Sequence, residues 1–244
     1  MNGLAFPTHH KQGKDMMRRL LIPMLIVMLT ATKAGAQEDP IYRMEMGVEA
    51  GATGYLGDFN GNLTKDLQGA AGIVVRRLFN PYIGLNLSGF YGKLKGSSAD
   101  VETYYPDYRQ SAYEFSNTLV DVSLTFEYNF WPYGTGRDYR GAKRLTPYVF
   151  GGIGATSVSG GTKNVFTANI PLGIGVKYKI SPRMNLGLSW AMHFSLNDEL
   201  DGVKDPAYVK SSGAFKNTDD YSALMVSLTY SFSAKCATCN KDNY

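Results

Sequence analysis

The sequence predicts an all-β protein, a transmembrane antiparallel up-and-down β-barrel of about eight strands. First, bulky apolar residues alternate with small or polar ones in one segment after another. Because successive strand residues face opposite sides of a sheet, each such strand has one apolar and one polar face. Second, short turns alternate with long polar connections, as in outer-membrane barrels. Third, 27 glycines and 17 tyrosines in 244 residues indicate many short strands rather than disorder.

Residues 1–36 have the features of a secretory signal peptide. A basic region around Arg18 precedes an apolar stretch of about a dozen residues, which is too short to span a bilayer as a helix. Small residues at 34–36 form a cleavage motif, and Met16 or Met17 is the more natural start of translation. The formal net charge of +4 includes this region, so it indicates no partner.

The mature chain is expected to hold one domain and a tail. We predict an outer-membrane barrel at 37–234 and a periplasmic tail at 235–244, with no transmembrane helix, because no stretch of about 20 apolar residues follows the signal. Both cysteines, Cys236 and Cys239, lie in the tail. Two ligands are too few for a zinc site, so we predict a tail disulfide or a contact with a partner.

Four strands are expected in the first half of the mature chain. The first begins near residue 42 and the third near residue 83, while the fourth alternates most clearly. The second, at about 70–79, is weaker, because two consecutive arginines interrupt its pattern. The outward apolar faces are predicted to carry Tyr42, Met44, Met46, Val48 and Ala50; Ile73 and Val75; Ile83, Leu85, Leu87 and Tyr91; and Val120, Val122, Leu124, Phe126, Tyr128 and Phe130.

Four more strands are expected in the second half. The fifth, at about 148–157, is rich in glycine and ambiguous in register, whereas the other three alternate over ten residues or so. Their apolar faces are predicted to carry Ile170, Leu172, Ile174, Val176, Tyr178 and Ile180; Met184, Leu186, Leu188, Trp190, Met192, Phe194 and Leu196; and Leu224, Val226, Leu228, Tyr230 and Phe232.

The connections define two ends of the barrel. Short turns are expected at 80–81 and 181–183, and a longer basic turn at 131–146. The remaining connections are mostly long and polar, at 57–67, 96–114 and 197–220, with a short exception at 159–164. Since short turns face the periplasm in outer-membrane barrels, we predict an outer-membrane location with both mature termini in the periplasm.

The alternative fold is a soluble sandwich or lipocalin-like barrel, in which the apolar face would point inward. The polar faces combine charges with many glycines, which suits a narrow, packed polar lumen. The apolar faces end in aromatic residues, as interfacial girdles do. Both features favour the membrane barrel.

Charged residues of three strands are predicted to meet inside one mouth of the barrel. We expect a salt-bridged plug there, because buried charges are costly unless they pair. The alternative is a solvated rim, where such pairs contribute little. The residues of this predicted cluster are Arg43, Glu45, Glu127, Lys177 and Lys179.

Candidate catalytic chemistry is sparse. His193 and Ser195 are expected to point inward from one strand, and Asp198 and Glu199 follow, so a Ser/His/acid lipid hydrolase is a third hypothesis. Proximity in sequence alone supports it, and ordinary lumen residues explain it as well. The acidic loop 198–205 does not have the spacing of an EF-hand. We predict no enzyme, no metal or other cofactor, and no nucleic-acid partner.

Several segments, taken in order, resemble a known family: 51–60 (GATGYLGDFN), 77–81 (RLFNP), 127–130 (EYNF), 145–154 (LTPYVFGGIG), 169–179 (NIPLGIGVKYK) and 185–188 (NLGL). The chain resembles the PorG-like outer-membrane barrels of the type IX secretion system over almost all of its mature length. The resemblance implies a non-catalytic barrel that supports protein export and associates with a periplasmic ring complex. It brings no catalytic residues.

A structural role suits a barrel too narrow to pass a folded protein. We expect it to sit among outer-membrane lipids and to dock the ring components through its basic turn and its tail; the turn being merely solvated is the alternative. The second functional hypothesis is a free-standing barrel for surface adhesion or envelope integrity, with loop residues Tyr104, Tyr105, Tyr108 and Tyr113 as an aromatic patch. The predicted docking residues are Arg137, Arg140, Lys143, Arg144, Cys236 and Cys239.

Overall fold

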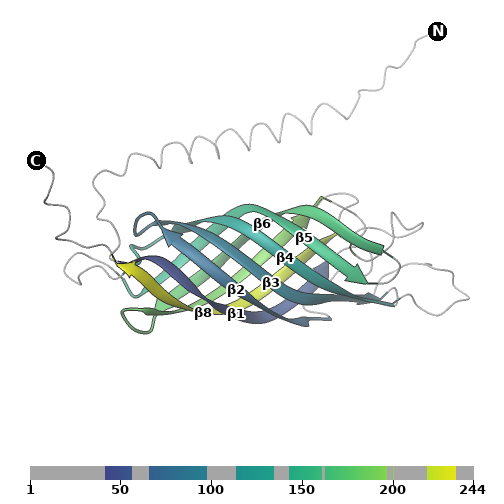
Figure 1. The fold of residues 1–244 in the computed structure, drawn as a ribbon, viewed down its shortest axis with the longest axis horizontal. Helices are drawn as coiled ribbons and strands as arrows, with labels where there is room; N and C mark the ends of the chain where they lie inside the picture. The colour runs from purple at the N-terminus through teal and green to yellow at the C-terminus, as the bar shows by residue number, and fades with distance from the viewer. Residues whose placement is uncertain are drawn as a thin grey trace, which may run out of the picture. The chain divides into compact units, whose positions relative to one another are not determined.

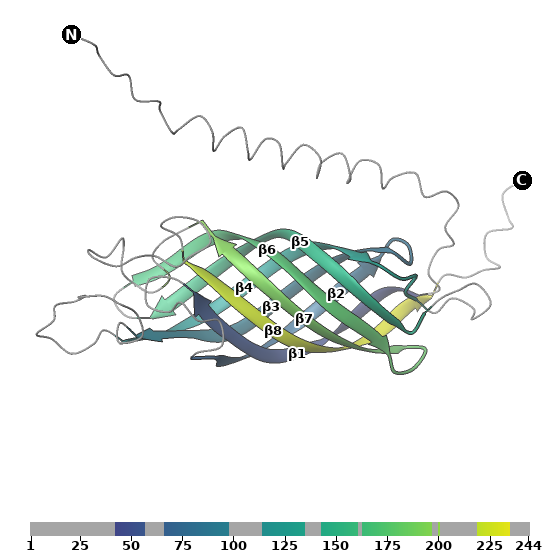
Figure 2. The same cartoon turned by 180° about the vertical axis from the view of Figure 1, so that it is seen from behind.

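The chain folds as a closed antiparallel barrel in which each strand pairs with the next and the last pairs with the first (Figures 1 and 2). The structure is a computed structural model that describes residues 42–56, 66–97, 114–134, 143–160, 163–196, 200 and 219–234. This confirms the predicted fold class. The strands are β1 (Tyr42–Leu56), β2 (Gln68–Leu78), β3 (Ile83–Ser97), β4 (Glu114–Asn129), β5 (Leu145–Gly160), β6 (Lys163–Lys179), β7 (Met184–Ser195) and β8 (Asp220–Ala234).

The two ends of the barrel differ in their connections. At one end, here called the turn end, lie the connections β2–β3, β4–β5 and β6–β7, together with the start of β1 and the end of β8. The opposite end is called the loop end. The turn after β2 is closed by the Asn80 side chain, which accepts hydrogen bonds from the backbone N–H groups of Tyr82 and Ile83, both at 2.8 Å. Asparagine favours such turns because its side chain replaces a backbone acceptor.

Alternation is preserved in β2, where the sequence analysis expected it to break. Arg76 points into the lumen and is buried, whereas Arg77 points outward and is exposed. The pair therefore continues the period of two: the outward face carries Ile73, and the inward face carries Val74. The expected interruption was wrong, because a cation is tolerated inside when a carboxylate is there to meet it.

Inward-facing glycines allow the strands to approach closely. A Cβ atom at Gly47 would collide with the backbone of β8 at Leu228, and one at Gly152 would collide with the backbone of β4 at Leu124. Glycine is therefore required at these positions, where the neighbouring strand leaves no room for a Cβ atom. The same requirement explains the glycine-rich sequence of β5, whose register the structure resolves with Tyr148 inward and Ile153 outward.

The outer surface carries an apolar belt. Each strand contributes outward residues that are about half exposed, from 47% to 69% in one mid-belt residue per strand. From Val120 to Phe130, strands rising about 3.3 Å per residue and tilted about 40° give a belt roughly 25 Å tall, the height of the lipid-facing band of outer-membrane-type barrels. The mid-belt residues are Val48, Ile73, Leu87, Val122, Ile153, Leu172, Leu188 and Val226.

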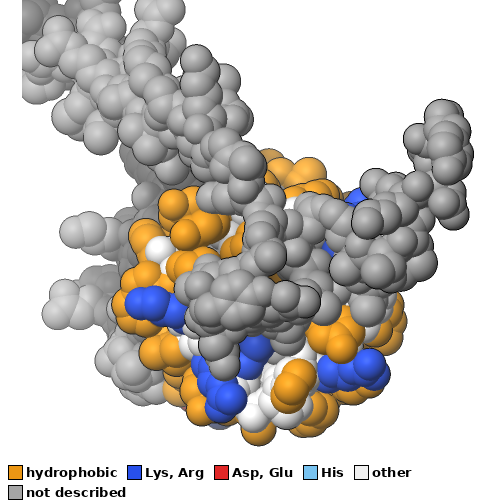
Figure 3. Space-filling view, turned by 90° about the vertical axis from the view of Figure 1, so that its left-hand side faces the viewer, with side chains coloured by type: hydrophobic (Ala, Val, Ile, Leu, Met, Phe, Trp, Pro, Cys, Tyr) orange, Lys and Arg blue, Asp and Glu red, His pale blue; other side chains and the backbone are white. Residues whose placement is uncertain are grey.

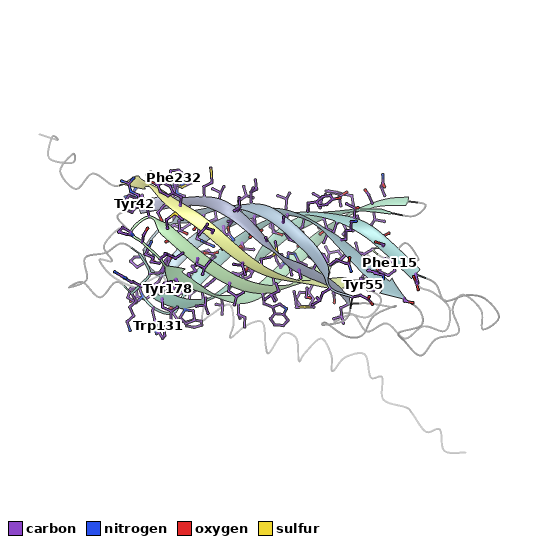
Figure 4. The ribbon with its side chains drawn as sticks, turned by 90° about the horizontal axis from the view of Figure 1, so that it is seen from below. Tyr42, Tyr55, Phe115, Trp131, Tyr178 and Phe232 are labelled. Carbon is purple, nitrogen blue, oxygen red and sulfur yellow. The ribbon has the colours of Figure 1, made fainter. Side chains whose placement is uncertain are left out.

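Aromatic residues edge the belt at the turn end. Figure 4 places Tyr42, Trp131, Tyr178 and Phe232 at that end of the barrel. Phe79, Phe130 and Tyr230 are further outward aromatic residues of the same end. Rings with one apolar and one polar side favour the boundary between hydrocarbon and water, so this girdle marks one edge of the belt.

The polarity of the barrel reverses toward the loop end. There the interior is a packed apolar cluster, and Figure 4 shows two of its members, Tyr55 and Phe115, close together. The outward positions beside it are polar, for example Lys93 on β3 and Ser116 on β4. A polar lumen along the whole barrel was therefore a wrong expectation. The cluster comprises Tyr55, Ala70, Phe90, Leu94, Phe115, Leu119, Val158, Val165, Leu200, Tyr221, Ala223 and Met225.

Candidate functional site

Four buried charges meet in the lumen near the turn end. Arg76 of β2 donates from Nη1 to Glu45 Oε2 of β1 at 2.7 Å, and its Nε lies 2.7 Å from Glu127 Oε2 of β4. Lys177 of β6 binds the same Glu127 oxygen. We call these four residues the lumen ion cluster. Its two cations and two carboxylates alternate in space and cancel in charge.

Polar and aromatic groups complete the surroundings of the cluster. Lys177 Nζ also donates to Asn129 Oδ1 at 3.2 Å and lies 4.0 Å from the ring centroid of Tyr148. Thr229 Oγ1 approaches Glu45 Oε2 at 3.5 Å. All four charged side chains are almost completely buried, and burial of an unpaired charge costs several kcal/mol. The pairing makes the polar lumen tolerable and ties together strands β1, β2, β4 and β6.

The structure brings some of the residues of the predicted charge cluster together and separates others. Glu45, Glu127 and Lys177 do come together, whereas Lys179 donates to Asn185 Oδ1 at 2.8 Å instead. Arg43 is half-buried at the mouth. Arg76, the central member, was missed. The sequence does indicate its direction, because Arg76 lies two residues after the inward-facing Val74 on the same strand.

Tyr133 closes the mouth beyond the ion cluster. It belongs to the β4–β5 turn, is fully buried, and its backbone N–H donates to Pro81 O at 3.0 Å. The Lys179 ammonium lies 4.9 Å from its ring centroid. Burial, reinforced by the nearby carboxylate of Glu45, raises the pKa of Tyr133 well above its ordinary value. The phenol therefore stays neutral, and Tyr133 covers the cluster with an uncharged side chain.

A second buried network surrounds Asp121 of β4, nearer the loop end. Its carboxylate accepts hydrogen bonds from Ser123 at 2.6 Å, Thr156 at 3.0 Å, Asn169 at 2.6 Å and Tyr221 at 2.6 Å. These four donors satisfy the hydrogen-bonding capacity of the buried carboxylate. The network links β4, β5, β6 and β8 and separates the ion cluster from the apolar cluster.

A small cavity lies between the two polar regions. Its volume is about 40 Å³, and its walls include Arg76, Ser123, His193 and the buried carboxylate of Glu49. A water needs roughly 10–15 Å³ of such space, so the cavity has room for only a few. The lumen between the described residues is thus nearly filled, as expected for a barrel of about eight strands.

His193 and Ser195 lie inside the barrel, as predicted, but the geometry does not favour hydrolysis. His193 Nδ1 is 3.7 Å from Asp121 Oδ2, beyond hydrogen-bond length, and the imidazole stacks on Tyr221 at 4.6 Å between centroids. Ser195 is buried. The adjacent cavity is far too small for a lipid substrate. Asp198 and Glu199 lie outside the described residues.

Residue Leu200 brings the β7–β8 connection back onto the apolar cluster. It is completely buried. Its backbone N–H donates to Asp219 Oδ2 at 2.9 Å, and its carbonyl accepts from Asn117 Nδ2 at 2.8 Å. The other Asp219 oxygen accepts a hydrogen bond from Tyr55. This residue therefore packs into the loop end of the lumen, opposite the lid at the turn end.

The described surface of the turn end is basic (Figure 3). Lys143 and Arg144 of the predicted docking residues lie there and are exposed. Arg137, Arg140, Cys236 and Cys239 lie outside the described residues, as do the signal region and the tail. Among the residues that the structure describes, no group of three or more His, Cys, Asp and Glu side chains could hold a metal ion.

The comparisons with known proteins identify one family and several solved structures that are similar to this chain. The profile of a family described as Domain of unknown function (DUF6089) matches residues 18–241. No curated protein matches the sequence. The similar solved structures have low identity and low TM-scores, and they carry no inference about function. They include Neisserial surface protein A (15% identity, 78% of this chain and 97% of that chain, TM-score 0.43), the attachment invasion locus protein Ail of Yersinia pestis in complex with the heparin analogue sucrose octasulfate (12%, 78% and 99%, 0.43) and OprG of Pseudomonas aeruginosa (10%, 81% and 99%, 0.44).

Proposed function

The chain belongs to the DUF6089 family, and on that premise we propose that it is a non-catalytic outer-membrane barrel that anchors a periplasmic partner. The observation that carries the proposal is an apolar belt around a nearly filled lumen. In water such a belt would be a large exposed apolar patch, which marks a membrane or interaction surface. Its estimated height suits the hydrocarbon layer of an outer membrane.

Because the lumen is nearly filled, we expect the function to reside on the outer surfaces of the barrel. The ion cluster and Tyr133 occupy the turn end, and the apolar cluster occupies the loop end. A solute has no continuous path between them through the described residues. A protein that neither conducts solutes nor offers a substrate-sized cavity acts by what binds to its outside.

The turn end is the surface we propose for docking. Short turns face the periplasm in barrels of this type, and the exposed charges of this end are positive. An acidic surface on a periplasmic partner would complement Lys143 and Arg144, with the basic turn and the tail extending the contact.

The finer assignment is a structural component of the type IX protein secretion system that docks its periplasmic ring. It is supported by the six sequence segments that, taken in order along the chain, resemble the PorG-like family. Several of these segments lie at the ends of strands. The profile match names no function, so this assignment depends on experiment.

The test is a charge reversal, K143E/R144E, combined with deletion of residues 235–244. We expect the variant to insert into the outer membrane at normal levels while ring components no longer co-purify and secreted cargo stays in the periplasm. The matched control is K93E/K95E on the outward face of β3 at the loop end, which should leave both readouts unchanged. Undiminished co-purification and secretion in the first variant would refute the docking role.

A free-standing barrel with a surface role is the second candidate. The favouring observation is the polar outer wall beside the apolar cluster, which carries the strands beyond the belt. This extension would hold the long loops, where the predicted tyrosine patch lies, above the lipid. Shortening those loops should then abolish adhesion while secretion continues, which is the opposite of the outcome for the docking role.

A further inference from the structure

The exposed charges at the turn end have one sign. The only acidic side chains described at this end, Glu45 and Glu127, are buried in the lumen. Figure 3, which faces this end, shows patches of Lys and Arg spaced around a mostly apolar rim. The exposed cations are Arg77, Lys143, Arg144 and Arg183.

Three of these cations lie over aromatic rings: Arg77 near the end of β2, Lys143 in the β4–β5 connection and Arg183 in the β6–β7 connection. A cation within about 6 Å of a ring centroid is attracted by the ring's negative face. The three cations are spread around the barrel, so the pairs form an interrupted ring, which we call the cationic rim. Its pairs are Arg77 with Phe79 at 5.4 Å, Lys143 with Trp131 at 5.1 Å and Arg183 with Tyr42 at 5.3 Å.

Arg183 is the most firmly positioned member of the rim. Its Nε donates to the Tyr42 hydroxyl at 3.2 Å and its Nη1 to the Tyr230 hydroxyl at 2.9 Å. These tyrosines belong to β1 and β8, so a turn residue is held against two neighbouring strands. Neither of these two hydrogen bonds uses Nη2, and the Arg183 side chain is exposed. A guanidinium held at a fixed depth with a further donor suits a phosphate oxygen.

The depth of the rim identifies the ligand. Phe79, Trp131 and Tyr230 are outward residues at the edge of the apolar belt, where aromatic rings meet the lipid headgroups. In a barrel inserted as proposed, cations beside those rings would lie level with the phosphates of the adjoining leaflet. Arg77 is an outward residue of β2, on the same face as Ile73 of the belt, so its side chain faces lipid.

We propose that the cationic rim binds the phosphates of anionic phospholipid headgroups in the leaflet at the turn end. The barrel then recruits a shell of negatively charged lipid around its turn end. The inference depends on the membrane insertion proposed above and is independent of any protein partner.

The test uses Trp131 as a reporter inside the rim. The chain has two tryptophans, so a Trp190→Phe background leaves Trp131 as the one tryptophan. The protein is inserted into vesicles of phosphatidylcholine that contain brominated phosphatidylglycerol, or into vesicles in which the phosphatidylcholine is brominated instead. Quenching of Trp131 then gives the relative binding constant of the anionic lipid at the rim.

We expect the anionic lipid to be preferred, and the preference to fall by about fivefold for each cation removed, which is about 25-fold in R77Q/R183Q, where Lys143 remains. The matched control K93Q/K95Q, on the outward face at the loop end, should keep the full preference. The conservative variant R77K/R183K should keep most of it, because the charge remains.

Failures of insertion and of lipid binding are distinguishable. Heat-modifiable migration on gels measures insertion independently of lipid binding. If R77Q/R183Q does not insert, the Trp190→Phe parent alone still tests the lipid preference. Equal quenching by both lipids in the inserted parent would overturn the proposal. So would an unchanged preference in inserted R77Q/R183Q, including the case where that variant loses a protein partner instead.

Discussion

Replacing Arg76 by methionine tests the role of the lumen ion cluster most sharply. Arg76 is the only residue of the described chain that bridges Glu45 and Glu127, with 2.7 Å to each. The substitution removes one positive charge from a cluster that is neutral in the parent. Glu127 keeps Lys177, whereas Glu45 keeps only the 3.5 Å approach of Thr229 among the contacts described above.

The expected cost follows from leaving Glu45 buried and unpaired. Breaking a buried pair by removing one partner typically costs about 3–5 kcal/mol. Methionine has a similar length and fills the space of the arginine stem, so most of this cost is electrostatic. We therefore expect R76M to lower the free energy of unfolding by about 3–5 kcal/mol.

A second variant separates charge imbalance from lost packing. E45L/R76M removes the carboxylate as well and leaves the neutral pair Glu127–Lys177. Replacement of a whole buried pair by apolar residues is often close to neutral. The double variant should therefore recover at least half of the stability that R76M loses.

The measurement is equilibrium unfolding in urea of the barrel refolded into lipid vesicles, followed by tryptophan fluorescence. The parent, R76M, E45L and the double variant form one thermodynamic cycle. If R76M unfolds within about 1 kcal/mol of the parent, or if the double variant is less stable than R76M, the cluster does not work as described.

Three further predictions address the wall, the belt and the lumen. Gly47→Ala should sharply reduce folding yield, because its Cβ would collide with the β8 backbone, whereas Gly69→Ala, with open space at its Cβ, should fold as the parent does; refolding yields from gel shifts check this. Ile153→Arg, at mid-belt, should cost about 2–4 kcal/mol and Ser116→Arg, beyond the belt, about 0–1 kcal/mol in the same urea assay, and equal costs would contradict the belt. In planar bilayers the parent should show no stable open-pore conductance, and nanosiemens steps would contradict the filled lumen.

The strand number and the lipid-facing residues were predictable from sequence because they follow from a period of two. That pattern is local, so Val120 to Phe130 could be assigned without any knowledge of neighbouring strands. The structure confirms those outward residues in β4, and likewise the inward positions of His193 and Ser195.

The interior contacts were less predictable because they depend on how strands are offset around the barrel. Glu45, Arg76 and Glu127 are far apart in sequence, and only the observed registers bring them to one level. The position of Arg76 two residues after Val74 predicts that its side chain points inward, but the sequence does not predict which carboxylates it pairs with. Arg43 and Lys179 have suitable charges on the inward face, yet they lie too near the mouth to join the cluster.

The reversal of polarity at the loop end is visible in the sequence as a change in the phase of the alternation. In β4 the apolar residues occupy odd positions at Phe115 and Leu119 and even positions from Val120 onward. A strand that leaves the membrane meets water outside, so its apolar residues must turn inward. The change of phase between Leu119 and Val120 therefore marks the edge of the belt.

The central claim is that the belt faces lipid, and a spin-label scan along β4 tests it most directly. Spin-labelled single cysteines at 114–130, introduced into C236S/C239S protein inserted in vesicles, would report accessibility to oxygen, which dissolves in lipid, and to a polar nickel reagent. We expect oxygen accessibility to peak at every even position from 120 to 130, and the polar reagent to reach even positions from 114 to 118. A protein that stays soluble without detergent, with both probes excluded from the even positions 120 to 130, would contradict the account.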